Sequence, residues 1–258
     1  MDVRGLLLDL EGVLYEDNTP IPGVADAMGA LVASGFKVRY LTNTTTRPRQ
    51  AIVDRLIGMG FDLKAEHVFT PGIAAGQLLR RKNLTRIHLA AAPELAEDLP
   101  DVEVVDDEPQ AIILGDLFRA FDWDRLNVLF RMMRQGAVLV ALHKNRYCRR
   151  DGEIALDLGP FVAALDYAAG TQASIVGKPS SLFFDLALAD LGLDVQSVAM
   201  VGDDIEADIG GARRAGMTTI QVKTGKFTPK DREHPSIRPD HLIQSAADLS
   251  GLLLDQKD

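Results

Sequence analysis

The sequence predicts an α/β fold in which a doubly wound parallel sheet is interrupted by a second α/β unit. Short apolar runs alternate with helical patterns along almost all of the 258 residues, which is typical of βαβ units. One run, GLLLDL at 5–10, is apolar on both faces, as strands of a covered parallel sheet are. The stretch from about 75 to about 175 has an alternation of its own, which indicates an inserted unit.

The elements of the first part follow from helix and strand signals. Gly35 ends the first helical pattern, and Pro48 falls in the first turn of the second. The expected elements are a strand at 5–10, a helix at 23–34, a strand at 37–42, a helix at 47–60 and a strand at 67–70. The first part of the larger domain is therefore predicted to span residues 1–75.

The inserted unit is predicted at 76–175, and the larger domain resumes at 176–258. Trp123 and the apolar stripe at 129–133 are expected in the core of the insertion. After it the first pattern returns, with a strand at 173–177, a helix at 180–190, a strand at 197–203, a helix at 206–214, a strand at 218–222 and a closing helix at 244–254.

Composition narrows the possible functions. Hydrophobic residues make up 47% and charged residues 25%, as in ordinary globular proteins. The net charge of −9 argues against nucleic acid as a partner, although a bound cation and a lysine could still admit a phosphorylated substrate. The single cysteine, Cys148, excludes an internal disulfide and a cysteine-rich zinc site.

No segment resembles a membrane span or a signal peptide. The longest apolar runs, such as AVLVAL at 137–142, are the length of strands. The first residues, MDVRG, are not followed by an extended apolar stretch. We therefore expect a cytoplasmic protein that does not bind membranes.

Polar residues follow the predicted strands at the edge where an open parallel sheet binds ligands. Taken singly, each has a plain explanation, because Asp, Asn and Thr suit turns and helix caps and a lysine before a proline can be solvated. Their joint occurrence favours a shared site. The residues concerned are Asp9, Glu11, Thr42, Asn43, Lys178, Asp203, Asp204 and Asp208.

The electrostatics of such a group predict a metal ion. Two carboxylates about 4 Å apart repel by roughly 4 kcal/mol at an effective dielectric constant of about 20. Four aspartates at one edge (Asp9, Asp203, Asp204 and Asp208) would therefore need a cation. Oxygen ligands with room for water suit Mg²⁺.

The four segments DLEGVL, LTN, GKP and GDDIEAD resemble the ordered motifs of the haloacid dehalogenase superfamily. An insertion between the second and third motifs is similar to that of the NagD-like subfamily IIA, which has a large α/β cap domain. The stretches at 136–168 and 222–227 are similar to the phospholysine phosphohistidine inorganic pyrophosphate phosphatase group. The resemblance covers nearly the whole chain and implies a Rossmann-like core with a cap.

The resemblance also implies roles for the site residues. Asp9 would be the nucleophile that forms an aspartyl-phosphate, and Mg²⁺ would be bound by Asp9, Asp203 and the backbone carbonyl of Glu11. Thr42, Asn43 and Lys178 would bind the substrate phosphate, with Lys178 also offsetting charge in catalysis. Asp204 and Asp208 would orient metal-bound water or Lys178. A homodimer through the cap is what the family suggests.

Glu11 stands where most phosphatases of this superfamily have an aspartate that acts as general acid. Glutamate has similar chemistry but is one methylene longer. The expected activity is hydrolysis of a small phosphorylated molecule, with pyrophosphate or a phosphoramidate favoured because such leaving groups need little protonation. Two alternatives stay open: a catalytically weak, regulatory protein that binds phospholigands and in which Glu11 is impaired, and a phosphotransferase.

The basic stretch HKNRYCRR at 143–150 lies in the inserted unit. It is either a solvated hairpin edge or a cap surface that attracts an anionic substrate. A lone histidine such as His143 is more often structural than catalytic.

Overall fold

The computed structural model describes residues 2–150 and 152–254, which divide into two compact units. The first unit comprises residues 2–42, 50–69 and 178–254. The second comprises residues 43–49, 70–150 and 152–177. The second unit therefore interrupts the sequence of the first at two places. Most of the second unit is the long insertion that begins at residue 70.

The first unit contains a six-stranded sheet in the order β15-β14-β13-β1-β4-β5. Its neighbouring strands are all parallel. The strands are β1 (Gly5–Asp9), β4 (Lys37–Leu41), β5 (Val68–Phe69), β13 (Val198–Gly202), β14 (Thr218–Val222) and β15 (His241–Ile243). Numbered along the chain, this is the 3-2-1-4-5-6 order of a Rossmann-like sheet, which confirms the predicted fold class.

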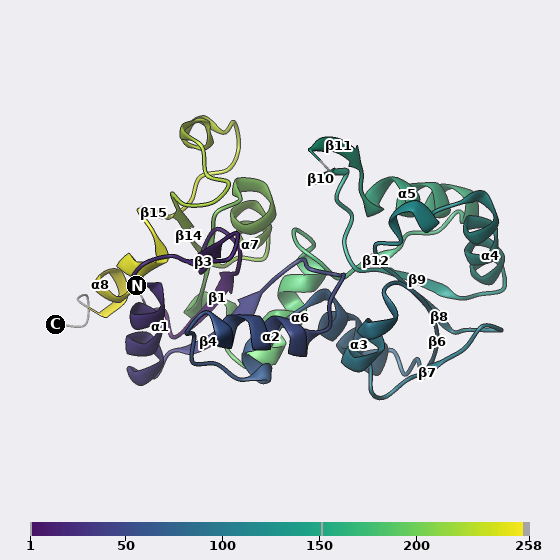
Figure 1. Ribbon diagram of the computed structural model, residues 1–258, viewed down its shortest axis with the longest axis horizontal. Helices are drawn as coiled ribbons and strands as arrows, with labels where there is room; N and C mark the ends of the chain where they lie inside the picture. Colours follow the sequence, from purple (N-terminus) through teal and green to yellow (C-terminus); the bar gives the residue numbers. More distant parts are fainter. Residues whose placement is uncertain (1, 151, 255–258) are drawn as a thin grey trace. The chain divides into compact units, whose positions relative to one another are not determined.

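Helices cover both faces of this sheet (Figure 1). On one face, Leu6 and Leu8 of β1 pack in a core with α1 (Val24–Ala33), α2 (Arg49–Gly58) and α8 (Leu249–Leu254). Leu7 points to the other face, because side chains alternate along a strand. There α6 (Ser181–Leu191) contacts β4, and α7 (Gly211–Arg214) contacts β14.

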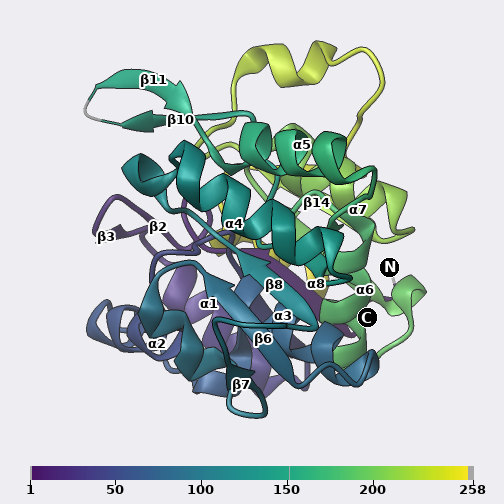
Figure 2. The same cartoon turned by 90° about the vertical axis from the view of Figure 1, so that its right-hand side faces the viewer.

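The second unit has a five-stranded parallel sheet in the order β12-β9-β8-β6-β7. Its strands are β6 (Arg86–Ala90), β7 (Glu103–Val104), β8 (Ala111–Leu114), β9 (Val138–Ala141) and β12 (Ser174–Ile175). Its helices are α3 (Pro71–Arg81), α4 (Trp123–Arg134) and α5 (Leu158–Ala169). Figure 2 shows α4 and α5 side by side, and their apolar side chains share one core with the sheet.

Short elements complete both units. The hairpins are β2 (Tyr15–Glu16) with β3 (Thr19–Pro20), and β10 (Tyr147–Arg150) with β11 (Glu153–Leu156). The short helical turns are η1 (Ala65–His67), η2 (Pro93–Asp98), η3 (Phe118–Ala120), η4 (Val195–Ser197), η5 (Ile205–Gly210), η6 (Pro229–Glu233) and η7 (Ala246–Asp248). The second hairpin confirms that the basic stretch includes a hairpin edge.

Several details of the predicted elements are wrong. The strand predicted at 173–177 does not belong to the first sheet, because β12 pairs with β9 of the second. Helix α2 begins at Arg49, so Pro48 precedes it. Trp123 is 75% exposed at the start of α4, whereas Leu129, Met132 and Met133 are buried as expected. Strand β15 was not predicted.

Among the residues that the structure describes, no helix has both the length and the apolar character needed to cross a bilayer.

Candidate active site

The carboxyl ends of three neighbouring strands carry predicted site residues. Asp9 ends β1, and Asp203 and Thr42 directly follow β13 and β4, which flank β1. Along the chain, strands are added on one side of β1 and then on the other, so the topological switch point lies between β1 and β13. Asp9 and Asp203 therefore stand where open α/β sheets bind ligands.

Lys178 bridges two of the aspartates. Its Nζ atom lies 2.6 Å from Oδ1 of Asp9 and 2.7 Å from Oδ1 of Asp208. The Lys178 side chain is almost fully buried. Burial alone would lower the pKa of Lys178, but the carboxylates of Asp208 and Asp9 outweigh burial and raise it. Lys178 is therefore a buried cation that fixes the position of the Asp9 carboxylate.

The turn η5 positions Asp204 and Asp208. Asp204 caps this turn, because its Oδ1 atom accepts hydrogen bonds from the backbone N–H groups of Glu206 (3.0 Å) and Ala207 (2.9 Å). The carbonyl of Asp204 accepts from the N–H groups of both Asp208 and Ile209, which widens the turn. Asp208 is fully buried, and its Oδ2 atom accepts from the N–H group of Asp204 at 3.2 Å. Both oxygens of Asp208 thus have donors.

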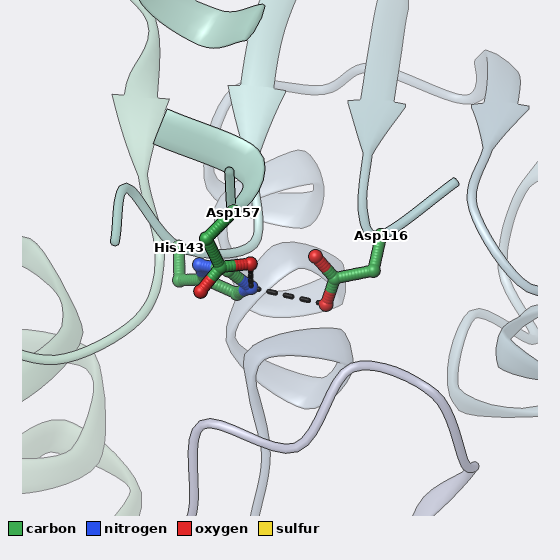
Figure 3. Close-up of side chains that lie close together, drawn as sticks. All are labelled: Asp116, His143 and Asp157. Atoms are coloured by element: carbon green, nitrogen blue, oxygen red, sulfur yellow. Dashed lines mark hydrogen bonds and ion pairs between the residues drawn. The ribbon is translucent and has the colours of Figure 1, made fainter. Parts of the chain in front are cut away.

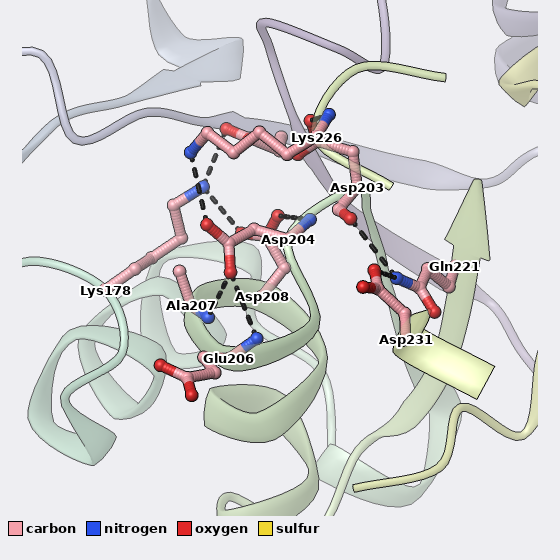
Figure 4. Close-up of polar contacts among 10 residues, drawn as sticks. Lys178, Asp203, Asp204, Glu206, Ala207, Asp208, Gln221, Lys226 and Asp231 are labelled. Carbon is pink, nitrogen blue, oxygen red and sulfur yellow. Dashed lines mark hydrogen bonds and ion pairs between the residues drawn. The ribbon is translucent and has the colours of Figure 1, made fainter. Parts of the chain in front are cut away.

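Asp203 has one satisfied and one unsatisfied oxygen. Its Oδ2 atom accepts a hydrogen bond of 2.7 Å from the backbone N–H group of Lys226 (Figure 4). Its Oδ1 atom is buried and has no hydrogen-bond partner among the described residues. Burial and the nearby charge of Asp9 raise the pKa of Asp203 to about 6. One carboxylate oxygen each of Asp9, Asp203 and Asp208 lies within 4.8 Å of the others, and Lys178 forms ion pairs with only Asp9 and Asp208 of the three.

Two glycines allow the backbone to approach Asp203. Gly12 and Gly225 both have positive φ angles, of 86° and 63°. A Cβ atom on either would collide with Oδ2 of Asp203. The two segments are also linked, because the Thr224 hydroxyl donates to the carbonyl of Gly12 and the N–H group of Gly225 donates to Oε1 of Glu16 at 2.7 Å. Glycine is therefore required at both positions.

The structure thus brings together five of the predicted residues, which are Asp9, Lys178, Asp203, Asp204 and Asp208. Glu11 is exposed just beyond β1, and Thr42 is buried after β4. Asn43 is the first residue of the second unit. The roles expected of Glu11, Thr42 and Asn43 stay predictions.

The sequence analysis assigned no role to two residues that contact this group. Lys226 reaches Asp203 through its backbone and Asp204 through its side chain. The buried Gln221 amide donates to the carbonyl of Asp203 at 3.2 Å and to Oδ2 of Asp231 at 2.9 Å (Figure 4). Both lie at or beyond the end of β14, at the same sheet edge as Asp9 and Asp203, which is the signal that could have identified them.

A second polar group lies within the second unit (Figure 3). Nε2 of His143 lies 3.1 Å from Oδ2 of Asp116 and 3.9 Å from Oδ1 of Asp157. The Thr45 hydroxyl also donates to Oδ2 of Asp116. The backbone N–H group of Asn145 donates to Nδ1 of His143 at 3.3 Å, so the ring proton belongs on Nε2 and points to Asp116. A metal-bound histidine needs an acceptor, not a donor, at its other nitrogen.

The pKa values of the two carboxylates of this second group are shifted in opposite directions. Burial alone would raise the pKa of Asp116, but the hydrogen bond and charge of His143 and the hydrogen bond from Thr45 outweigh it and lower the pKa. Burial raises the pKa of Asp157, and the Asp116 charge adds to the rise. Asp157 also caps α5 by accepting from the N–H group of Leu158 at 2.9 Å. We interpret this group as a hydrogen-bonded structural network.

Two family models match the chain. One, described as haloacid dehalogenase-like hydrolase, matches residues 6–104, and the other, described as HAD-hydrolase-like, matches residues 175–249. The human phospholysine phosphohistidine inorganic pyrophosphate phosphatase is 36% identical over 262 residues, which cover 99% of this chain and 96% of the human protein. The chain belongs to the haloacid dehalogenase-like hydrolases.

Solved structures of this family have the same fold. A p-nitrophenyl phosphatase from Archaeoglobus fulgidus is 27% identical with a TM-score of 0.89, covering 98% of this chain and 100% of that one. NagD from Escherichia coli K-12 is 25% identical with a TM-score of 0.86, covering 96% and 98%. The protein is therefore a phosphohydrolase of the NagD-like subfamily IIA, with a Rossmann-like core and an inserted α/β unit.

Proposed function

We propose that this phosphohydrolase is a Mg²⁺-dependent phosphatase that forms an aspartyl-phosphate on Asp9. The observation that carries the proposal is the buried Oδ1 atom of Asp203, which has no hydrogen-bond partner among the described residues. A buried, unpaired carboxylate oxygen is costly unless something binds it. A divalent cation between Asp203 and Asp9 would supply the missing interaction.

The donor set fits magnesium. Asp9, Asp203 and the backbone carbonyl of Glu11 would offer oxygen atoms only, which Mg²⁺ prefers. Asp208 is less suited as a direct ligand because both of its oxygens accept hydrogen bonds, and Asp204 is less suited because one of its oxygens caps η5. When bound, the ion would neutralise charge on the phosphoryl group during an in-line displacement.

Residues of the protein would act as nucleophile, as acid and base, and as phosphate ligands. A carboxylate oxygen of Asp9 would attack phosphorus as the bond to the leaving oxygen breaks, and water would then hydrolyse the resulting acyl phosphate. Glu11 would protonate the leaving oxygen and activate that water. Lys178 would hold Asp9 in place and offset the phosphoryl charge, and Asp208 would in turn orient Lys178. The Thr42 hydroxyl and the amides around Asn43 would bind phosphate oxygens.

The inserted α/β unit would serve as the cap. We assign it residues 76–175, with the catalytic core at 1–75 and 176–258, and propose that it closes over the site and excludes bulk water. A homodimer through this cap is part of the same proposal.

The substrate would be a small phosphorylated molecule. The name of the human relative includes phospholysine, phosphohistidine and inorganic pyrophosphate. Such leaving groups need little protonation, which suits an enzyme whose general acid is the longer Glu11. p-Nitrophenyl phosphate, after which the Archaeoglobus phosphatase is named, is a suitable reference substrate.

Steady-state phosphate release, measured with and without Mg²⁺, tests the proposal. The panel contains p-nitrophenyl phosphate, pyrophosphate, a phosphoramidate and several sugar and nucleotide monophosphates. We expect metal-dependent release that Asp9→Asn abolishes. No release from any substrate, with Mg²⁺ and phosphate still bound, would favour a regulatory phospholigand-binding protein instead. Transfer to an alcohol acceptor in preference to water would indicate a phosphotransferase.

A further inference from the structure

Lys226 contacts both aspartates of the GDD segment. Its backbone N–H group donates to Oδ2 of Asp203 at 2.7 Å, and its Nζ atom lies 3.2 Å from Oδ2 of Asp204. Figure 4 shows the Lys226 side chain extending from beside Asp203 toward the Asp204 carboxylate. Lys226 therefore brings a second ammonium group to the proposed active site.

The two lysines of the site differ in how firmly they are held. The Lys178 ammonium group is buried and binds two carboxylates, at 2.6 Å and 2.7 Å. The Lys226 side chain is 69% exposed and binds one carboxylate at a longer distance. Asp204 does not depend on this contact, because its other oxygen accepts from two backbone N–H groups. An exposed ion pair contributes little stability and is readily exchanged for a more strongly charged anion.

The backbone that carries Lys226 is fixed, whereas its side chain is not. Hydrogen bonds from Thr224 and Gly225 attach the segment to Gly12 and Glu16, and the N–H group of Lys226 itself attaches it to Asp203. The Cα atom thus has a set position beside the acidic group. The exposed ammonium group can turn from Asp204 to a ligand without moving the backbone.

We propose that Lys226 binds the leaving phosphoryl group of a diphosphate substrate and so favours phosphoanhydrides such as inorganic pyrophosphate over monoesters. This inference rests on the proposed function. Lys178 is already shared by Asp9 and Asp208, so the more accessible Lys226 suits the additional charge of a second phosphoryl group.

The chemical step creates negative charge on the leaving group, which the Lys226 ammonium group would neutralise. Asp9 attacks the terminal phosphorus of pyrophosphate, the bridging P–O bond breaks, and its electron pair leaves with orthophosphate. Water then attacks the phosphorus of the aspartyl-phosphate, which releases a second orthophosphate and regenerates Asp9. The Lys226 ammonium group would stabilise the departing orthophosphate more than p-nitrophenolate, which has a single oxygen anion with delocalised charge.

The test compares Lys226→Met with Lys223→Met, a matched control three residues earlier on the same segment. Values of kcat/KM are measured for pyrophosphate and p-nitrophenyl phosphate at saturating Mg²⁺. We expect Lys226→Met to lower the pyrophosphate-to-p-nitrophenyl phosphate ratio by about 10- to 100-fold, as loss of a hydrogen bond to a charged group would. Lys223→Met should change this ratio by less than about twofold. Lys226→Arg, which keeps the charge, should restore much of the ratio.

Other outcomes would overturn the inference. If Lys226 only steadies Asp204 and the metal, Lys226→Met would lower activity on both substrates equally and raise the Mg²⁺ concentration needed for half-maximal activity. A wild-type protein that hydrolyses p-nitrophenyl phosphate but not pyrophosphate would refute the role of Lys226 and leave the phosphatase proposal intact. Release from neither substrate would refute the proposed function itself.

Discussion

The two units each hold a cluster of carboxylates with a basic side chain, and the clusters differ in how their oxygens are satisfied. In the first unit, Lys178 joins Asp9 to Asp208, and Oδ1 of Asp203 has no donor within the described chain. In the second, His143 and Thr45 both donate to Asp116, and a backbone N–H group satisfies Asp157. The first group thus has a buried oxygen without a partner, whereas no buried side-chain oxygen of the second lacks one among the described residues.

The difference indicates that the donors around the carboxylates help to distinguish a candidate ligand site from a structural network. Both groups have three potential metal ligands with donor atoms within 4.8 Å of one another. The hydrogen bond from Asn145 to Nδ1 of His143 makes the second group a poor metal site. The unpaired oxygen of Asp203 makes the first group the better candidate.

The largest effect should come from filling the space around Asp203. Gly12→Ala would place a Cβ atom against Oδ2 of Asp203, and we expect kcat/KM for p-nitrophenyl phosphate to fall by about 100-fold or more, because small displacements of catalytic groups are costly. Gly35→Ala is the matched control, since Gly35 has a φ angle of 89° but nothing within 4 Å of its Cβ position. It should cost about 1 to 2 kcal/mol of stability without loss of activity per folded molecule. Equal activity of the two variants would contradict the role assigned to Asp203.

Asp116→Asn tests whether the second group is a structural network. It removes a charged acceptor from His143 and Thr45, and we expect the free energy of unfolding at pH 7 to fall by about 1 to 3 kcal/mol. The pKa of Asp116 is lowered in the folded protein, so its stabilisation is present above the unfolded pKa of about 4 and is lost as the pH falls through the lower folded value. The difference between wild type and variant should therefore shrink below about pH 4 in urea titrations.

Asp157→Asn provides the comparison within the same group. Burial raises the pKa of Asp157, so its ionised form is a cost at pH 7 that asparagine removes, and asparagine can still cap α5. We expect a change of less than about 0.5 kcal/mol in the free energy of unfolding. If Asp157→Asn were as destabilising as Asp116→Asn, the opposite pKa shifts assigned to the two carboxylates would be wrong.

The smallest effect on activity should come from Glu11→Asp, which shortens the proposed general acid. We expect turnover of sugar phosphates to rise severalfold, and up to about 10-fold, relative to turnover of pyrophosphate, because only the former needs a well-placed acid. Paired assays on one enzyme preparation measure this ratio. An unchanged ratio would mean that any preference for pyrophosphate has another cause, of which Lys226 is one.

The strand ends of the first sheet could be predicted because a buried parallel strand has a strong local pattern. Asp9, Thr42 and Asp203 each follow such a run, and the sheet order places them on neighbouring strands. Lys178 contacts the same cluster but does not follow a strand of the first sheet. It follows β12, which belongs to the second sheet, and a short apolar run does not reveal which of two sheets it will join.

Residues that act through long-range contacts could not be predicted. Gln221 lies in an ordinary strand pattern, and only the fold shows that its amide joins Asp203 to Asp231. Asp116, His143 and Asp157 are separated by 27 and 14 positions in the sequence, and no short motif connects them. Trp123 was expected in the core together with the apolar stripe at 129–133, but helix α4 buries Leu129, Met132 and Met133 and leaves Trp123 exposed.

Calorimetric titration with Mg²⁺ would decide which of the two groups of acids binds the ion. Three proteins are compared: wild type, Asp203→Asn and His143→Gln. We predict that wild type and His143→Gln bind Mg²⁺ alike, whereas Asp203→Asn does not bind it detectably. Undiminished binding by Asp203→Asn, together with loss of binding by His143→Gln, would place the ion in the second unit and contradict the assignment of the metal site to Asp9 and Asp203.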